Sequence, residues 1–184
     1  MTAIHKNAIK IAADAAARAH PGAIPERREN TLYHASGTGC RAGKILWRGP
    51  QGIIAAWLHV MEDCDDGVTI VRDTLQKTGL PQEERDEIFV IVSALTKNPA
   101  IQEKSERLAD TLERINQAPP QAILIKLCDR MGNLVDARDQ GKKFLSIYLR
   151  CSDQLIDALS DSAMKCGYVR ALETLKAVQR TYMG

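Results

Sequence analysis

The stretch GIIAAWLHVMED at residues 52–63 constrains the fold of this chain most strongly, because it contains an unbroken apolar run at 53–58. A helix that is apolar on every side must be buried by other elements. His59, Glu62 and Asp63 then follow at i, i+3 and i+4, the spacing that brings side chains to one helical face. The stretch predicts a buried helix with one polar stripe, which is typical of an active site. The alternative is that these acidic residues form a solvent-exposed segment at the end of the helix and have no role in a site.

A second stretch, AILIKLCDRMGNLVDARD at residues 122–139, repeats this pattern. Its first part is apolar apart from Lys126, and Asp129, Asn133 and Asp136 follow at i, i+4 and i+7. Burying a carboxylate without a partner is costly. We therefore expect a cation or strong hydrogen-bond donors beside Asp129, and the second stripe favours the active-site interpretation of the first.

The rest of the chain is also helical in its periodicity, and no segment shows sustained strand alternation. The segment at 21–39, rich in Pro, Gly, Asn, Ser and Thr, predicts a long loop. No linker or internal repeat divides the sequence, so we expect an all-α, multi-helix single domain over residues 1–184. Further helices are predicted at 3–20, 41–47, 68–78, 81–98, 104–117, 142–160 and 163–182.

Composition limits the classes of function. With 184 residues and 45% hydrophobic content the chain can bury a full core, and its net charge of +2 gives no basic field for nucleic acid. The five cysteines form no CxxC pair, which indicates reduced thiols in the cytoplasm. Neither a signal peptide nor a membrane span is visible. We expect a soluble cytoplasmic protein whose oligomeric state stays open.

The chemistry-bearing residues suggest a metal site. His34 in the loop, His59 with Glu62 and Asp63, and Asp129 on the second buried helix would converge on one divalent ion. Mixed imidazole and carboxylate ligands suit Mn, Fe or Zn better than Mg or Ca. Such an ion would lower the pKa of a bound water, and an adjacent carboxylate could orient that water for attack on phosphorus. Candidate phosphate-binding cations are Arg27, Arg28 and Lys97.

Five segments together resemble a known family: RRENTLYH at 27–34, AAWLHVMED at 55–63, ALTKNP at 94–99, ADTLERINQAP at 109–119 and IKLCDRMGNL at 125–134. Over roughly residues 8–150 the chain resembles the HD-domain phosphohydrolases, and among them the small alarmone hydrolases related to the hydrolase half of the RelA/SpoT-type enzymes. The last segment is close to the family's Lys-Leu-Ala-Asp-Arg-x-x-Asn-Leu element.

The resemblance implies an activity and a set of site residues. Members of the family use manganese to remove the 3′-pyrophosphate of guanosine tetra- or pentaphosphate. The implied metal ligands are His34, His59 and Asp129, and the implied acidic pair that handles the attacking water is Glu62 and Asp63. The implied nucleotide or phosphate contacts are Arg27, Arg28, Lys97, Asn133 and Tyr148.

The chain departs from the family in its central motif. The family has His-Asp-x-x-Glu-Asp, whereas residues 59–63 read His-Val-Met-Glu-Asp, one residue shorter and without the second ligand. Such a deletion rotates the later residues of a helix by about 100° relative to the earlier ones. His34 is also followed by Ala35 where the family has Pro. Two alternatives therefore stand beside alarmone hydrolysis: hydrolysis of another nucleotide, and a degenerate, non-catalytic HD domain that binds a nucleotide or a partner.

Overall fold

The structure is a computed structural model that describes residues 1–19, 49–59, 61 and 66–183. Within these ranges it contains eight helices and no strand, which confirms the predicted all-α class. The predicted loop at 21–39 and the predicted helix at 41–47 lie outside the described residues. The helices are α1 (Ala3–Ala19), α3 (Pro50–Leu58), α4 (Gly67–Lys77), α5 (Gln82–Leu95), α6 (Lys104–Gln117), α7 (Gln121–Asp139), α8 (Lys142–Lys165) and α9 (Val169–Met183).

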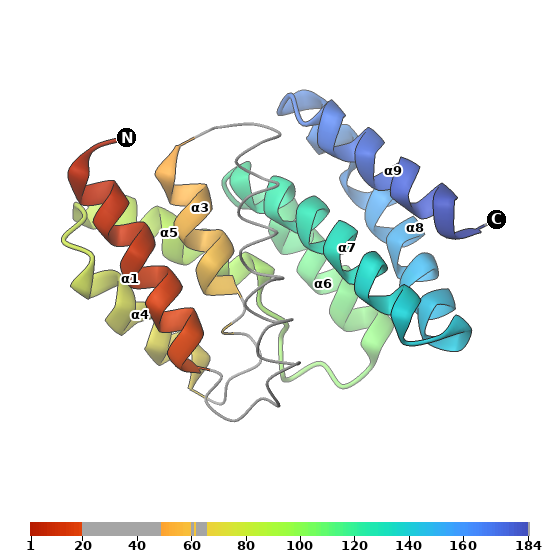
Figure 1. Ribbon diagram of the computed structural model, residues 1–184, viewed down its shortest axis with the longest axis horizontal. Helices are drawn as coiled ribbons and strands as arrows, with labels where there is room; N and C mark the ends of the chain where they lie inside the picture. The colour runs from red at the N-terminus through yellow and green to blue at the C-terminus, as the bar shows by residue number, and fades with distance from the viewer. Residues whose placement is uncertain (20–48, 60, 62–65, 184) are drawn as a thin grey trace.

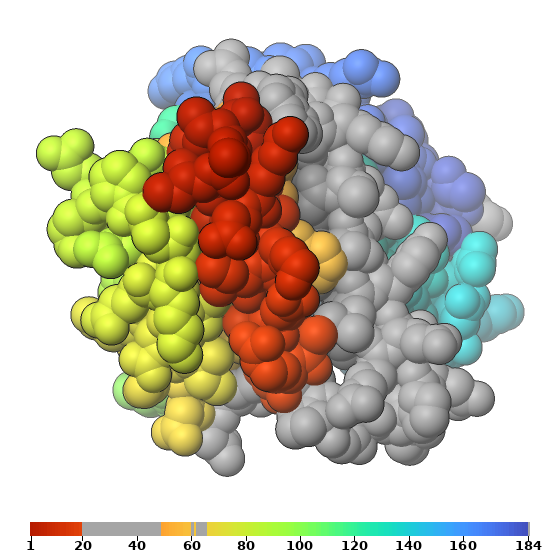
Figure 2. All heavy atoms as spheres, turned by 60° about the vertical axis from the view of Figure 1, so that its left-hand side comes forward, coloured from red at the N-terminus to blue at the C-terminus, as the bar shows by residue number. Residues whose placement is uncertain are grey.

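Helix α7 lies in the middle of the bundle (Figure 1). It packs against α3, α5, α6, α8 and α9, and α6 also contacts both α5 and α8. Helix α1 covers α3 and packs beside α4, and Figure 2 shows it running along the surface next to the α4–α5 segment. The N- and C-termini lie at opposite ends of the bundle (Figure 1).

The two helices predicted to be buried are buried. Every residue of α7 from Ala122 to Gly132 is inaccessible or nearly so, and in α3 the same holds for Ile54, Ala55, Ala56 and Leu58. These side chains belong to one hydrophobic core that also takes residues from α1, α4, α5, α6, α8 and α9. The buried stretch of α7 nevertheless includes charged residues, which are described below.

Local sequence explains where the helices start. Helix α3 begins with Pro50, and proline fits the first turn because it has no N–H to leave unsatisfied. The preceding Gly49 has a φ of 82°, a backbone conformation that glycine adopts readily. Helix α6 is capped by the Glu103 carboxylate, which accepts hydrogen bonds from the backbone N–H groups of Ser105 and Glu106. The Ser105 hydroxyl and these N–H groups lower the pKa of Glu103.

Predicted helix boundaries were wrong at the ends of α5 and α8 and at the start of α9, which begins at Val169 rather than at 163. Helix α8 continues to Lys165, although a break near 161–162 was predicted, and it stops only where Gly167 takes a φ of 78°. There the Gly167 N–H donates to the Met164 carbonyl (3.1 Å) and the Tyr168 N–H to the Ala163 carbonyl (2.7 Å), a Schellman motif. Helix α5 ends at Leu95, three residues before the predicted end, and Thr96 is extended.

Within the described residues, none of the helices has the length and apolar character needed to cross a membrane.

Candidate functional site

His59 and Asp129, two of the predicted metal ligands, lie together where α3 meets α7. His59 is the first residue after α3, and Asp129 lies on the buried stretch of α7. The distance from His59 Nε2 to Asp129 Oδ1 is 3.8 Å, and each residue is only 7% exposed. Two side chains far apart in the sequence thus meet inside the bundle.

The imidazole of His59 is oriented by its own helix. Its Nδ1 lies 2.6 Å from the carbonyl oxygen of Ala56. A carbonyl oxygen only accepts, so Nδ1 carries a hydrogen and Nε2 is the nitrogen that faces the carboxylate. Metal-binding histidines commonly donate their second ring N–H to a backbone carbonyl in this way, which fixes the ring and the tautomer.

Asp129 has the neighbours that its burial requires. Lys126 Nζ lies 3.2 Å from Oδ2, and Asn133 Nδ2 donates to Oδ1 over 3.1 Å. All three side chains come from one face of α7, because they are three and four residues apart. The cation and the donor expected beside this carboxylate are therefore present, and they hold it in one orientation.

The His59–Asp129 pair fits a divalent ion. Two metal–ligand bonds of about 2.1 Å each span up to about 4.2 Å, so the 3.8 Å between Nε2 and Oδ1 leaves room for one ion bound to both. Among the described residues, no group of three or more His, Cys, Asp or Glu side chains could hold a metal. The other residues predicted for this centre, His34, Glu62 and Asp63, lie outside the described residues.

Helix α3 ends at Leu58 and His59 follows it directly, whereas Glu62 and Asp63, the other members of the predicted polar stripe, lie outside the described residues. The sequence beyond it is acidic, with Glu62, Asp63, Asp65 and Asp66. Negative charge is unfavourable at the carboxyl end of a helix, where the backbone dipole is already negative. This acidic sequence therefore does not favour a longer α3.

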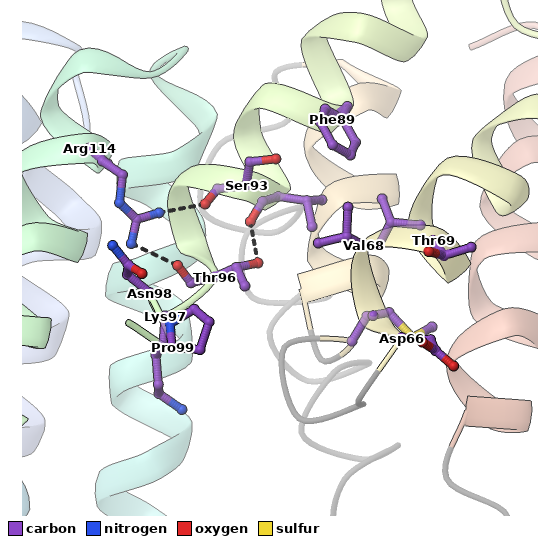
Figure 3. A pocket seen from close by; sticks show the side chains of 14 residues that line it. Asp66, Val68, Thr69, Phe89, Ser93, Thr96, Lys97, Asn98, Pro99 and Arg114 are labelled. Atoms are coloured by element: carbon purple, nitrogen blue, oxygen red, sulfur yellow. Dashed lines mark hydrogen bonds between the residues drawn. The ribbon is translucent and has the colours of Figure 1, made fainter. Parts of the chain in front are cut away.

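A pocket of about 640 Å³ lies beside this region, between α4, α5 and the segment that comes after α5. Figure 3 shows Val68 and Phe89 on one side of it and Thr96, Lys97 and Asn98 on the other, and Met61 also lines it. Its volume falls in the range of small-molecule sites. Lys97, a predicted phosphate contact, is exposed at this pocket.

Arg114 of α6 shapes this pocket rather than offering a charge to it. Its guanidinium donates to the carbonyl oxygens of Ser93 (2.6 Å) and Thr96 (2.8 Å) (Figure 3). It also donates to the carboxylate of Asp110 (2.8 Å). These bonds satisfy carbonyl groups that the end of α5 leaves without helical partners. They account for the early end of α5 and for the direction that the chain takes into Lys97.

Tyr148, another predicted contact, lies on α8, which packs against α7. The guanidinium carbon of Arg130 lies 5.4 Å from the centre of the Tyr148 ring, and the centre of the Phe144 ring lies 5.0 Å from the same point. Of the remaining predicted contacts, Asn133 binds Asp129, whereas Arg27 and Arg28 lie outside the described residues.

Lys126 and Arg130 lie beside Asp129 on α7, and the sequence pattern predicted no role for either. Both are charged and buried, at 9% and 7% exposure. The available signal was their spacing: they flank Asp129 on a helix whose neighbouring residues are apolar.

Comparison with known proteins adds no assignment. No protein-family model, no curated protein and no solved structure matches this chain.

Proposed function

We propose that this chain is a metal-dependent phosphohydrolase of the HD type that removes the 3′-pyrophosphate of guanosine tetra- or pentaphosphate. The observation that carries the proposal is the orientation of His59: its Nδ1–H is held by the Ala56 carbonyl, and Nε2 is turned toward the buried carboxylate of Asp129. The resemblance of the five segments to alarmone hydrolases supports the choice of substrate.

In this proposal His59 and Asp129 hold the ion, and Lys126 and Asn133 keep the carboxylate in place. A bound manganese ion would act as a Lewis acid and lower the pKa of a coordinated water. Water adds to the phosphorus on the 3′ oxygen, the bond from phosphorus to that oxygen breaks, and the oxygen takes a proton. The products are pyrophosphate and GDP or GTP.

The remaining predicted roles belong to the same proposal. His34 is the third metal ligand, and Glu62 and Asp63 handle the attacking water. Lys97 binds a phosphate from the pocket beside Met61, which its exposed side chain lines. The other contacts to the nucleotide are Arg27, Arg28, Asn133 and Tyr148.

The test is hydrolysis of guanosine tetraphosphate by purified protein with and without manganese, together with Asp129→Asn. We expect release of GDP and pyrophosphate that requires the metal. Since Asp129→Asn removes a ligand while conserving shape, we expect a loss of at least about 100-fold in kcat/KM and in bound manganese.

Asp139→Asn is the matched control, because it removes a carboxylate from the same helix at an exposed position paired with Arg138. It should leave turnover unchanged. Metal-independent turnover, or full activity in Asp129→Asn, would refute the proposal. Tight nucleotide binding without turnover or bound metal would identify a non-catalytic HD domain instead.

A further inference from the structure

Helix α7 buries more positive than negative charge. Lys126 and Arg130 are one helical turn apart, and both are at least nine-tenths buried. Among the described residues that are buried, Asp129 is the only acid. Its carboxylate is already used: Oδ2 lies 3.2 Å from Lys126 Nζ, while Oδ1 accepts from Asn133 and faces His59. One buried cation is therefore left without a counter-charge in this part of the chain.

Arg130 is the buried cation for which the described residues provide no counter-charge. Its Nε is buried and has no hydrogen-bond partner in the structure, although a buried charged donor without an acceptor is expensive. Its guanidinium lies 5.4 Å from the ring centre of Tyr148, in cation–π contact. This contact holds the guanidinium beside α8, while its Nε–H remains a buried donor without an acceptor.

The missing group has a defined chemistry. A guanidinium edge presents parallel N–H donors that match two oxygens of a phosphate. Lys126, on the same face of α7, is paired with Asp129, so the three buried charges of the helix sum to one positive charge, which an anion would balance. Phe144, whose ring packs 5.0 Å from that of Tyr148, supports the aromatic side of the site.

We propose that Arg130, held beside Tyr148, binds a phosphate-type oxyanion between α7 and α8. The oxyanion is either inorganic phosphate or the phosphate of a larger ligand. The proposal does not depend on hydrolysis, because the buried charge and the donor without an acceptor are properties of α7 itself.

The test uses the full chain and the Nε–Hε resonance of Arg130 in a ¹H–¹⁵N NMR spectrum, which reports directly on the atom in question. We expect a saturable shift of this resonance when inorganic phosphate is added, but not when sodium chloride is added to the same ionic strength. A larger response to GDP at equal concentration would assign the site to a phosphorylated ligand.

Arg130→Gln and Arg130→Lys separate recognition from charge. Arg130→Gln should raise, at least about tenfold, the phosphate concentration that gives half of the maximal thermal stabilisation. Arg130→Lys should recover part of the affinity, because lysine keeps the charge but lacks the forked donors of a guanidinium. Arg138→Gln is the matched control: it removes an exposed arginine from the same helix.

Two results would overturn the proposal. One is an unchanged Arg130 Nε–Hε resonance in phosphate and in GDP, which can be observed even if neither variant of Arg130 folds. The other is equal phosphate stabilisation of the wild type and of Arg130→Gln. A response lost equally in Arg138→Gln would show nonspecific screening and would count against the site as well.

Discussion

At the scale of single residues, the environment of Asp129 shows how α7 tolerates charge in the core. The carboxylate contacts a cation, an amide and the imidazole of His59 within 3.8 Å. Removing one member of a buried ion pair leaves the other charge desolvated and uncompensated, which is much worse than never burying the pair. Lys126 therefore stabilises the fold by compensating the buried charge of Asp129, independently of any ion at His59.

Lys126→Met tests this stabilising effect. Methionine keeps the volume of the side chain but removes the charge 3.2 Å from Asp129 Oδ2. We expect the free energy of unfolding in urea to fall by about 3 kcal/mol, and manganese to recover part of it if it binds Asp129. Lys176→Met, which breaks an exposed pair with Glu173, should cost less than about 1 kcal/mol. Equal losses in the two variants would contradict the argument.

The sequence predicted the partners of this site but not their geometry. The polar stripe on α7 was visible as Asp129 and Asn133 at helical spacing, and burial required a cation beside the carboxylate. The 3.8 Å approach of His59 to Asp129 depends on how α3 packs on α7, and no local pattern encodes that distance. The role of Arg130 was hidden for the same reason, because its aromatic neighbour lies on α8.

At the scale of helices, the sequence predicted positions better than ends. Apolar periodicity located α4, α6 and α7 because one face of each must be buried. The end of α8 was missed because serine and aspartate at 160–162 resemble a break, whereas Leu159 and Ala163 on the buried face continue the helix to Gly167. The end of α5 was missed because Arg114, which caps it, lies on another helix.

The start of α4 offers a sharper test of an element boundary. A Cβ atom on Gly67 would lie 2.1 Å from the carbonyl oxygen of Met61, a backbone atom that cannot move aside by itself. We expect Gly67→Ala to lower the free energy of unfolding by about 2–3 kcal/mol and to displace α4 from the pocket that contains Lys97. The measurement is urea denaturation, with the m-value checked for two-state unfolding.

Gly52→Ala in α3 is the matched control. There the new Cβ would meet only the flexible side chain of Gln121, at 3.4 Å. Because alanine favours the helix over glycine, a gain of about 0.5 kcal/mol is expected. A loss in Gly67→Ala no larger than the change in Gly52→Ala would show that the close approach at Met61 relaxes without penalty.

At the scale of the whole molecule, α7 connects the two sides of the bundle. The helices α3 and α5 pack against it, as do α8 and α9, and α6 contacts α5, α7 and α8, while α1 and α4 reach it through α3 and α5. Because side chains of the buried stretch of α7 pack against all of these neighbours, a cavity in α7 should weaken packing throughout the core. We therefore expect the described helices to unfold as one cooperative unit.

Leu127→Ala tests this cooperativity. Leu127 is fully buried at the middle of α7, so the cavity should lower the free energy of unfolding by about 2–5 kcal/mol. If the bundle is one unit, the most protected amides of α1, α3, α8 and α9 should lose the same amount of protection in native-state hydrogen exchange. Val90→Ala, at a side chain that is 47% exposed on α5, should change stability by no more than about 0.5 kcal/mol. Loss of protection in only some of these helices would mean that the bundle does not unfold as one unit. The contact between α3 and α7, which brings His59 to Asp129, would then open at a lower free energy than the rest of the core.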